Sequence, residues 1–141
     1  MATRIDLAKR LLQRAGDDEA AAKAMMPIES VTDVIVGMLA HQAVEKSLKA
    51  VLSFSAVNFP FVHDIDELTV LCTNAGHPLP DSLGGADQLT PYAGTLRYDA
   101  EDPELVDRDT ALRWATSAVA WARGIVEVAE VPAAPEDEAV D

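Results

Sequence analysis

Cysteine, aromatic residues and long apolar segments are all scarce in this sequence. Cys72 is the only cysteine, so no disulfide can form within the chain, and no Cys/His spacing indicates a zinc site. No window approaches the roughly 20 apolar residues that a membrane-spanning helix needs. Residues 1–14 mix charged and apolar side chains and do not resemble a signal peptide. We therefore expect a soluble protein of the reducing cytoplasm that has no membrane contact.

Positive charge is also scarce. The chain has 11 Lys and Arg against 24 Asp and Glu, which gives a formal net charge of −13. Proteins that bind duplex nucleic acid use several Lys and Arg contacts to phosphates on a basic face. We therefore expect no binding to duplex nucleic acid and no adsorption to an anionic membrane. The net charge does not exclude a local cationic pocket.

Small and medium apolar side chains are plentiful. They contribute to an apolar fraction of 49% over 141 residues, which is enough for one domain with its own core. Apolar residues recur at helical spacing, and no window alternates with the period of a strand. We predict an all-α, up-and-down bundle of four to five helices over residues 1–130. An acidic, disordered tail is predicted for residues 131–141.

Prolines, glycines and capping residues set the bounds of the predicted helices. These helices span residues 3–26 (with a bend at Gly16 and a restart capped by Asp17 or Asp18), 31–55, 65–75 after Asp64, 86–96 around Pro91, and 103–130 after an Asp102-Pro103 start. The second helix carries apolar residues on more than one face and should lie at the centre. Two apolar stripes on the last helix favour a homodimer.

One polar stripe interrupts the apolar second helix. Gln42, Glu45, Lys46 and Lys49 occupy positions i, i+3, i+4 and i+7, so they share one face. Two interpretations stay open at this point. The stripe is either a solvated face with a Glu45–Lys49 ion pair, or a seam beside a groove whose two ammonium groups bind a phosphate.

This stretch resembles the signature of the HEPN family. The matching residues are Gln42, Ala43, Glu45, Lys46, Lys49, Ala50 and Leu52. Val62-His63-Asp64-Ile65 is similar to the Thr/Val-His-Asp-Leu opening of the family's next helix. Arg97-Tyr98 is similar to an Arg-Tyr pair that the family often follows with Pro, where this chain has Asp99. The resemblance spans about residues 4–130.

The resemblance implies a small helical bundle, commonly a homodimer, that is associated with nucleotide binding. Many such proteins are encoded beside a minimal nucleotidyltransferase. A major branch consists of ribonucleases, often toxins, in which an Arg is followed after four to six residues by a His. The His serves as general acid or base and the Arg steadies the phosphate. No Arg–His pair with this spacing occurs here, and Arg97 is followed by several carboxylates, so catalysis by the family mechanism is not expected.

The residues predicted to bind a nucleotide or phosphate are Lys46, Lys49, Arg97 and His63, and the surrounding polar motif consists of Gln42, Glu45 and Tyr98. We expect the three cations to converge on one hollow. Structural roles stay open as well: His63 bonding backbone beside a capped helix, and Arg97 clamped by nearby acids. His41 and Glu45 lack a third ligand at a supporting spacing, so no metal site is predicted. No catalytic residue is predicted, and no cofactor other than a nucleotide ligand.

We therefore expect a non-catalytic HEPN-type protein that binds a nucleotide, a nucleotidyltransferase-like partner, or both. Two alternatives stay open. One is a divergent ribonuclease that brings Arg97 together with His41 or His63 across a dimer. The other is a structural or adaptor bundle without a ligand, in which the polar stripe only fixes the helix register.

Overall fold

The computed structural model describes residues 3–59, 61, 63–94 and 106–127. Within these ranges the chain forms helices and no strand, which confirms the predicted all-α bundle. The elements are α1 (Arg4–Met25), α2 (Asp33–Phe54), α3 (Ile65–Asn74), the 3₁₀ helices η1 (Asp81–Leu83) and η2 (Ala86–Gly94), and α4 (Arg108–Val126). None of these helices is both long enough and apolar enough to cross a membrane. The predicted tail over residues 131–141 lies outside the described ranges.

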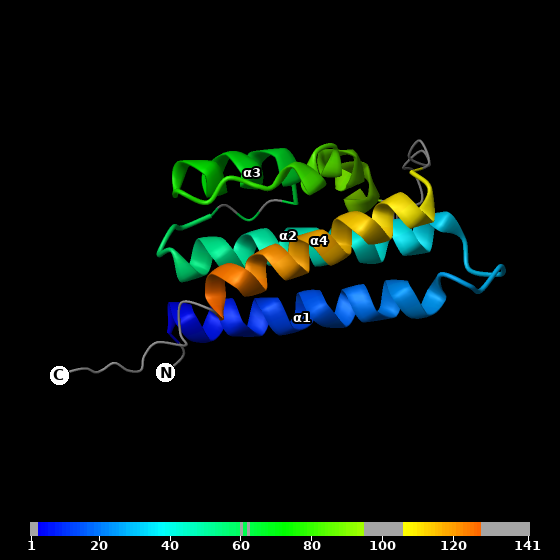
Figure 1. Cartoon of the computed structure of the whole chain (residues 1–141), viewed down its shortest axis with the longest axis horizontal. Helices are drawn as coiled ribbons and strands as arrows, with labels where there is room; N and C mark the ends of the chain where they lie inside the picture. The colour runs from blue at the N-terminus through cyan, green and yellow to red at the C-terminus, as the bar shows by residue number, and fades with distance from the viewer. Residues whose placement is uncertain (1–2, 60, 62, 95–105, 128–141) are drawn as a thin grey trace.

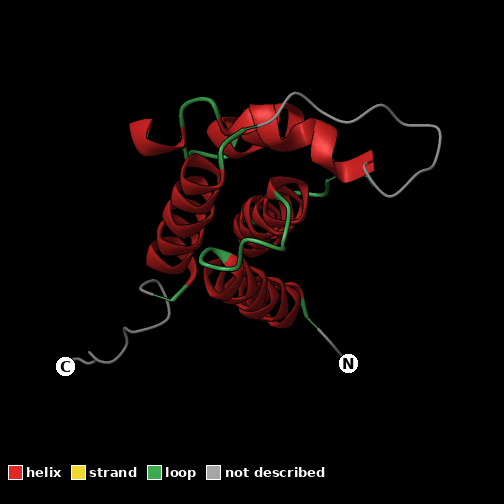
Figure 2. Ribbon diagram, turned by 90° about the vertical axis from the view of Figure 1, so that its right-hand side faces the viewer, coloured by secondary structure: helices red, strands yellow, loops and turns green. Residues whose placement is uncertain are grey.

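α2 is the central helix, as its apolar composition predicted. It packs against α1, α3, α4 and η2, and Figures 1 and 2 show these elements arranged around it. α1 runs antiparallel to α2, so the start of α1 lies beside the end of α2 (Figure 1). α2 also carries the buried polar side chains of the described structure, namely His41, Glu45, Ser47, Lys49 and Ser53.

α1 begins at a capping box and continues through the position of the expected bend. The Thr3 hydroxyl accepts a hydrogen bond from the Asp6 amide at 3.1 Å, and the Asp6 carboxylate accepts one from the Thr3 amide at 3.0 Å. The helix then runs past Gly16 without interruption, so the predicted restart at Asp17–Asp18 is wrong. A glycine within a helix costs only about 1 kcal/mol. The buried face of α1 outweighs that cost, through Ala8, Leu12, Ala15 and Ala22.

The described part of the α2–α3 connection turns back along α2. Ala56 adopts the left-handed conformation with a φ of 60°, and the amide of Val57 donates to the Leu52 carbonyl at 2.9 Å. Farther along, the backbone carbonyl of His63 lies 2.9 Å from Nε2 of His41, in the middle of α2. The connection therefore brings the backbone of His63 back beside His41, which lies more than three helical turns before the end of α2.

Asp64 caps α3, which confirms the predicted start of the short helix. Its Oδ1 accepts from the Asp66 amide at 2.9 Å. The amide of Ile65 donates to Thr90 Oγ1 of η2 at 3.2 Å. The segment predicted as a helix over residues 86–96 is a 3₁₀ helix over Ala86–Gly94 that includes Pro91, and the predicted loop before it contains η1.

α4 begins later than predicted. Val106 is not helical, so the helix that was predicted to run without a break from residue 103 is wrong. The amide of Val106 donates instead to the hydroxyl of Tyr92 in η2, at 2.9 Å. Asp107 is the N-cap and accepts from the Thr110 amide at 3.0 Å. Residues 95–105 and 128–141, and with them the predicted Asp102-Pro103 start, lie outside the described ranges.

Candidate functional site

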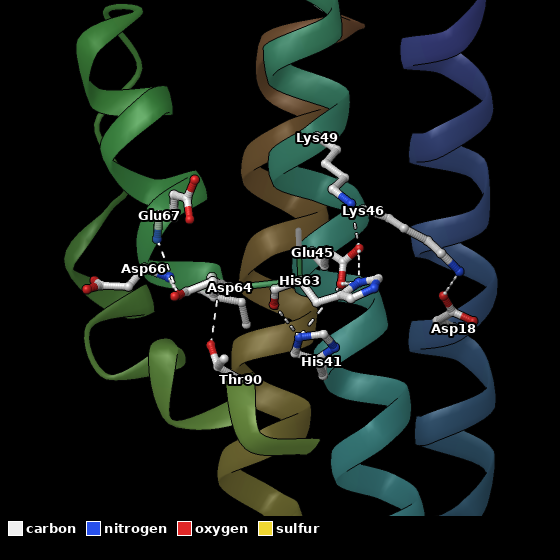
Figure 3. Close-up of polar contacts among 11 residues, drawn as sticks. Asp18, His41, Glu45, Lys46, Lys49, His63, Asp64, Asp66, Glu67 and Thr90 are labelled. Atoms are coloured by element: carbon white, nitrogen blue, oxygen red, sulfur yellow. Dashed lines mark hydrogen bonds and ion pairs between the residues drawn. The ribbon is translucent and has the colours of Figure 1, made fainter. Parts of the chain in front are cut away.

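A buried carboxylate, Glu45, joins two buried polar residues of α2, His41 and Lys49, to the α2–α3 connection. Its Oε2 accepts a hydrogen bond from Lys49 Nζ at 2.8 Å, one turn later on the same helix. Its two oxygens also lie 3.0 and 3.2 Å from Nδ1 of His63. Figure 3 shows these side chains pointing toward one another, with Glu45 and Lys49 on α2 and His63 on the connection before α3. The Glu45 carboxylate therefore accepts hydrogen bonds from two separate segments, from Lys49 on α2 and from His63 on the connection.

The Glu45–Lys49 pair is desolvated. Glu45 is 5% exposed and Lys49 is 6% exposed. Removing such charges from water is costly unless each has a partner, and here each charge neutralises the other. Lys49 Nζ also lies 5.6 Å from the centroid of the Phe59 ring, within cation–π range. The predicted ion pair is present, but it is buried rather than on a solvated face.

His41 is completely buried, one turn before Glu45. Its Nε2 lies 3.7 Å from Glu45 Oε1 and donates to the His63 carbonyl at 2.9 Å. Burial lowers the pKa of His41 from its ordinary value of 6.5, even though the His63 carbonyl and Glu45 act in the opposite direction. Burial therefore favours the neutral form of the ring, and Nδ1 has no hydrogen-bond partner among the described residues.

His63 is the exposed end of the network. Its side chain is 58% exposed, and Nδ1 donates to the Glu45 carboxylate. This orientation leaves Nε2 as an unprotonated acceptor when the ring is neutral. A histidine held by a buried carboxylate is the arrangement that a general base uses. Nε2 of His63 is therefore the exposed imidazole nitrogen of the network.

Lys46 points away from Lys49, toward α1. Its Nζ forms an ion pair with Asp18 at 2.7 Å, as Figure 3 shows. The two lysines of the signature thus engage different carboxylates: Lys46 that of Asp18 on α1, and Lys49 that of Glu45 within α2. Arg97 and Tyr98 lie outside the described residues, so the predicted convergence of Arg97 with the lysines stays a prediction. Gln42 is half-buried on α2.

The histidines and carboxylates of this network do not form a metal site. Nε2 of His41 is used by the His63 carbonyl, and the oxygens of Glu45 are used by Lys49 and His63. More generally, no group of three or more His, Cys, Asp and Glu side chains in the described part of the chain is placed to hold a metal ion.

A groove that the sequence reasoning missed lies between the start of α1 and the end of α2. It has a volume of about 670 Å³, and its lining residues are Thr3, Arg4, Leu7, Arg10, Ser53, Ala56, Val57, Asn58 and Phe59. The signal for it was a local charge imbalance. Residues 3–15 hold four cations and one acid in a chain that is acidic as a whole. Helical spacing alone does not show that two of these arginines face the end of another helix.

The chain was compared with known proteins at the level of families, of curated sequences and of solved structures. Neither the curated proteins nor the solved structures gave a match. The family model for the HEPN domain matches residues 8–131. This range contains the polar stripe of α2, the His63–Asp64 start of α3 and the whole of α4. Because the match covers most of the chain, the protein belongs to the HEPN domain family.

Proposed function

We propose that this protein is a non-catalytic member of the HEPN family that binds a nucleotide, a nucleotidyltransferase-type partner, or both. The observation that carries the proposal is the position of Glu45, whose two oxygens are engaged by Lys49 and His63. The signature residues therefore hold segments of the chain together. A buried network of this kind, in which both oxygens of Glu45 have partners, favours one arrangement of the fold, and we infer that this arrangement presents the binding surface.

The charges of the network argue for binding over phosphodiester cleavage. Cleavage needs a proton-transfer group together with a cation that faces the same phosphate. Lys46 is neutralised by Asp18 and Lys49 by Glu45, and His41 is buried in its neutral form. The absence of an Arg–His pair with four to six intervening residues supports the same conclusion.

Calorimetric titration with ATP and GTP tests the nucleotide part. We expect heat of binding with at least one of the two at concentrations up to about 1 mM, which corresponds to roughly −4 kcal/mol at the weakest. The same protein should leave total RNA intact over a long incubation. A complete lack of heat with both nucleotides, in protein that is folded by circular dichroism, would remove the nucleotide from the proposal.

The His63–Glu45 pair favours a second candidate, a divergent ribonuclease. His63 has an exposed ring whose Nδ1 is fixed by a buried carboxylate, so Nε2 is available as a general base. Cleavage of RNA that is lost in His63→Gln, and that keeps its rate in Lys46→Gln, would establish this alternative over the binding role. Intact RNA with the wild-type protein would reject it.

A homodimer also remains part of the proposal. The outer side of α4 carries a shallow, largely apolar hollow of about 560 Å³, with Leu112, Trp114 and Ala120 among its lining residues. A second copy that packs on this side would bury apolar area on both chains. Light scattering at micromolar concentration should then give twice the mass of the chain, and Leu112→Glu should halve it. A wild-type protein with the mass of one chain contradicts this part of the proposal.

A further inference from the structure

The first half of α1 is basic, although the chain as a whole carries a net charge of −13. Of the nine residues that line the groove between α1 and α2, Arg4 and Arg10 are cationic and none is acidic. Asp6 is the one acid within residues 3–15, and its carboxylate is bonded to the Thr3 amide in the capping box. An anion in the groove therefore meets two guanidinium groups and no lining carboxylate.

Arg4 is fixed in place by the end of α2. One of its terminal nitrogens donates to the backbone carbonyl of Phe54, and its own carbonyl accepts from Ser53 Oγ at 2.7 Å. A guanidinium has five N–H groups in one plane, so the bond to Phe54 leaves donors for a second acceptor. A group that is already oriented loses less side-chain entropy when a ligand binds.

The C-terminal end of α2 carries partial negative charge, which by itself would repel an anion. That charge is largely satisfied within the chain. The acceptors of the last turn are Val51 O from the Ser55 amide, Ser53 O from the Ala56 amide, Leu52 O from the Val57 amide and Phe54 O from Arg4. Part of the charge of Arg4 is therefore used to cap α2. Arg10, which is exposed, supplies the cation that remains for a ligand.

The remaining wall of the groove is partly apolar, and one of its residues contacts the Glu45–Lys49 pair. Phe59 lines the groove, and its ring lies 5.6 Å from the ammonium of Lys49, which is itself bound to Glu45. Leu7, on α1, is a second apolar lining residue and is partly exposed. An aromatic face beside cations is the combination that holds a base and its phosphates.

We propose that this groove is the ligand site of the protein, and that it binds a nucleoside phosphate with its phosphate groups on Arg10 and Arg4 and its base against Phe59. The groove volume of about 670 Å³ is in the range of small-molecule sites. The inference rests on the proposed nucleotide binding, but it places the phosphates away from Lys46 and Lys49.

The test is a calorimetric titration of the full chain with three probes: ATP, GTP and tripolyphosphate. Arg10→Gln is compared with Arg14→Gln, which removes the same charge from an exposed position of α1 outside the groove. We expect Arg10→Gln to weaken ATP and tripolyphosphate binding at least about tenfold, since hydrogen bonds to charged groups are lost. Arg14→Gln should change either affinity less than about twofold. Phe59→Leu should weaken the binding of ATP and leave the affinity for tripolyphosphate unchanged.

The outcomes separate this site from the proposed function. ATP binding that is unchanged in Arg10→Gln overturns the groove and leaves nucleotide binding standing. Equal losses in Arg10→Gln and Arg14→Gln indicate general attraction to α1 and also overturn the groove. Binding of tripolyphosphate but of neither ATP nor GTP, lost in Arg10→Gln, supports the anion site and rejects the nucleotide function. No heat with any probe overturns both. Unchanged thermal midpoints of the variants exclude misfolding as the cause of a loss.

Discussion

The ammonium of Lys49 lies 2.8 Å from the carboxylate of Glu45, one helical turn away, and both side chains are buried. A surface pair of this spacing contributes a few tenths of a kcal/mol. In the buried pair each charge depends on the other, because neither is solvated. The pair therefore matters less as a source of stability than as a constraint: loss of Glu45 leaves the buried ammonium without a counter-charge, and loss of Lys49 leaves the carboxylate with only the His63 imidazole.

Substitutions at this pair should show strong coupling. We expect Glu45→Gln and Lys49→Met each to lower the free energy of unfolding by about 3 kcal/mol, because each removes the ionic partner of a buried charge. The double variant should be destabilised by clearly less than the sum. Urea unfolding of the four proteins measures the coupling energy. The matched control is Lys46→Gln with Asp18→Asn, a partly exposed pair whose coupling should stay below about 1 kcal/mol. Additive effects at Glu45 and Lys49 would contradict the buried ion pair.

The pKa of His41 makes stability depend on pH below neutrality. Burial lowers this pKa from 6.5, so the unfolded chain takes up a proton near pH 6.5 and the folded chain only at lower pH. In the window between these two values the unfolded state binds more protons. The free energy of unfolding must then fall as the pH falls, by at most about 1.4 kcal/mol per pH unit for one proton. The groups that face His41 are Glu45, His63 and Lys49.

The measurement is the free energy of unfolding of wild type and His41→Gln, taken at intervals from pH 7.5 to pH 5. The variant should be less stable at pH 7.5, since it disturbs the packing at a buried position and the bond to the His63 carbonyl. Its pH dependence should be shallower than that of wild type, so that the two curves approach each other as the pH falls. Parallel curves over this range would show that His41 does not titrate differently in the two states.

Local signals were sufficient to predict several elements of this fold. The Asp64 cap of α3 was predicted because an N-cap residue bonds amides two or three positions later. The pairing of Glu45 with Lys49 was predicted because residues four apart on a helix lie next to each other. The central place of α2 was predicted from apolar residues on more than one face. Each of these inferences uses neighbours within one helix.

The features that were missed depend on contacts between distant segments. Whether Glu45 and Lys49 are solvated is decided by the elements that cover α2, and helix spacing says nothing about this. The bond from His63 to Glu45 exists because the chain turns back after Ala56. The start of α4 was placed too early because the amide of Val106 is bound by a tyrosine hydroxyl 14 residues before it. The groove was not predicted for the same reason, since it is formed by two segments about 50 residues apart.

Arg108, at the start of α4, holds the connection between α1 and α2. Its Nε donates to the Asp33 carboxylate at 2.6 Å. The terminal nitrogens donate to backbone carbonyls of the same connection, namely those of Met25 at 3.2 Å, Met26 at 3.1 Å, Ile28 at 3.4 Å and Val31. A planar fork is needed to reach acceptors on several sides, and an ammonium group does not provide it.

Substitution of Arg108 should therefore destabilise the bundle even when the charge is kept. We expect both Arg108→Lys and Arg108→Ala to lower the free energy of unfolding, by about 1–2 and 2–4 kcal/mol respectively, because backbone carbonyls lose their donors. Arg113→Ala is the control, since among the described residues this exposed arginine on α4 donates only to the nearby Thr110 hydroxyl; its effect should stay within about 0.5 kcal/mol. An Arg108→Lys protein as stable as wild type would show that charge alone is sufficient.

Two glycines within helices are expected to respond in opposite directions to the same substitution. A Cβ added to Gly37 of α2 would lie 2.6 Å from Cδ1 of Tyr92 and closer still to Cε1. The Tyr92 ring is buried, and its hydroxyl accepts from the Val106 amide, so the ring cannot move away without loss. A Cβ added to Gly124 of α4 meets nothing within 4 Å.

Gly37→Ala should lower the free energy of unfolding by about 1–3 kcal/mol, because overpacking outweighs the better helix propensity of alanine. Gly124→Ala should raise it by about 0.5–1 kcal/mol, because only the propensity changes. Thermal and urea unfolding of both variants give the sign directly. Equal stabilisation by the two substitutions would mean that Tyr92 does not pack against Gly37. In that case α2 and η2 would not be in contact at this point, and the bond from the Val106 amide to Tyr92 would not fix the start of α4.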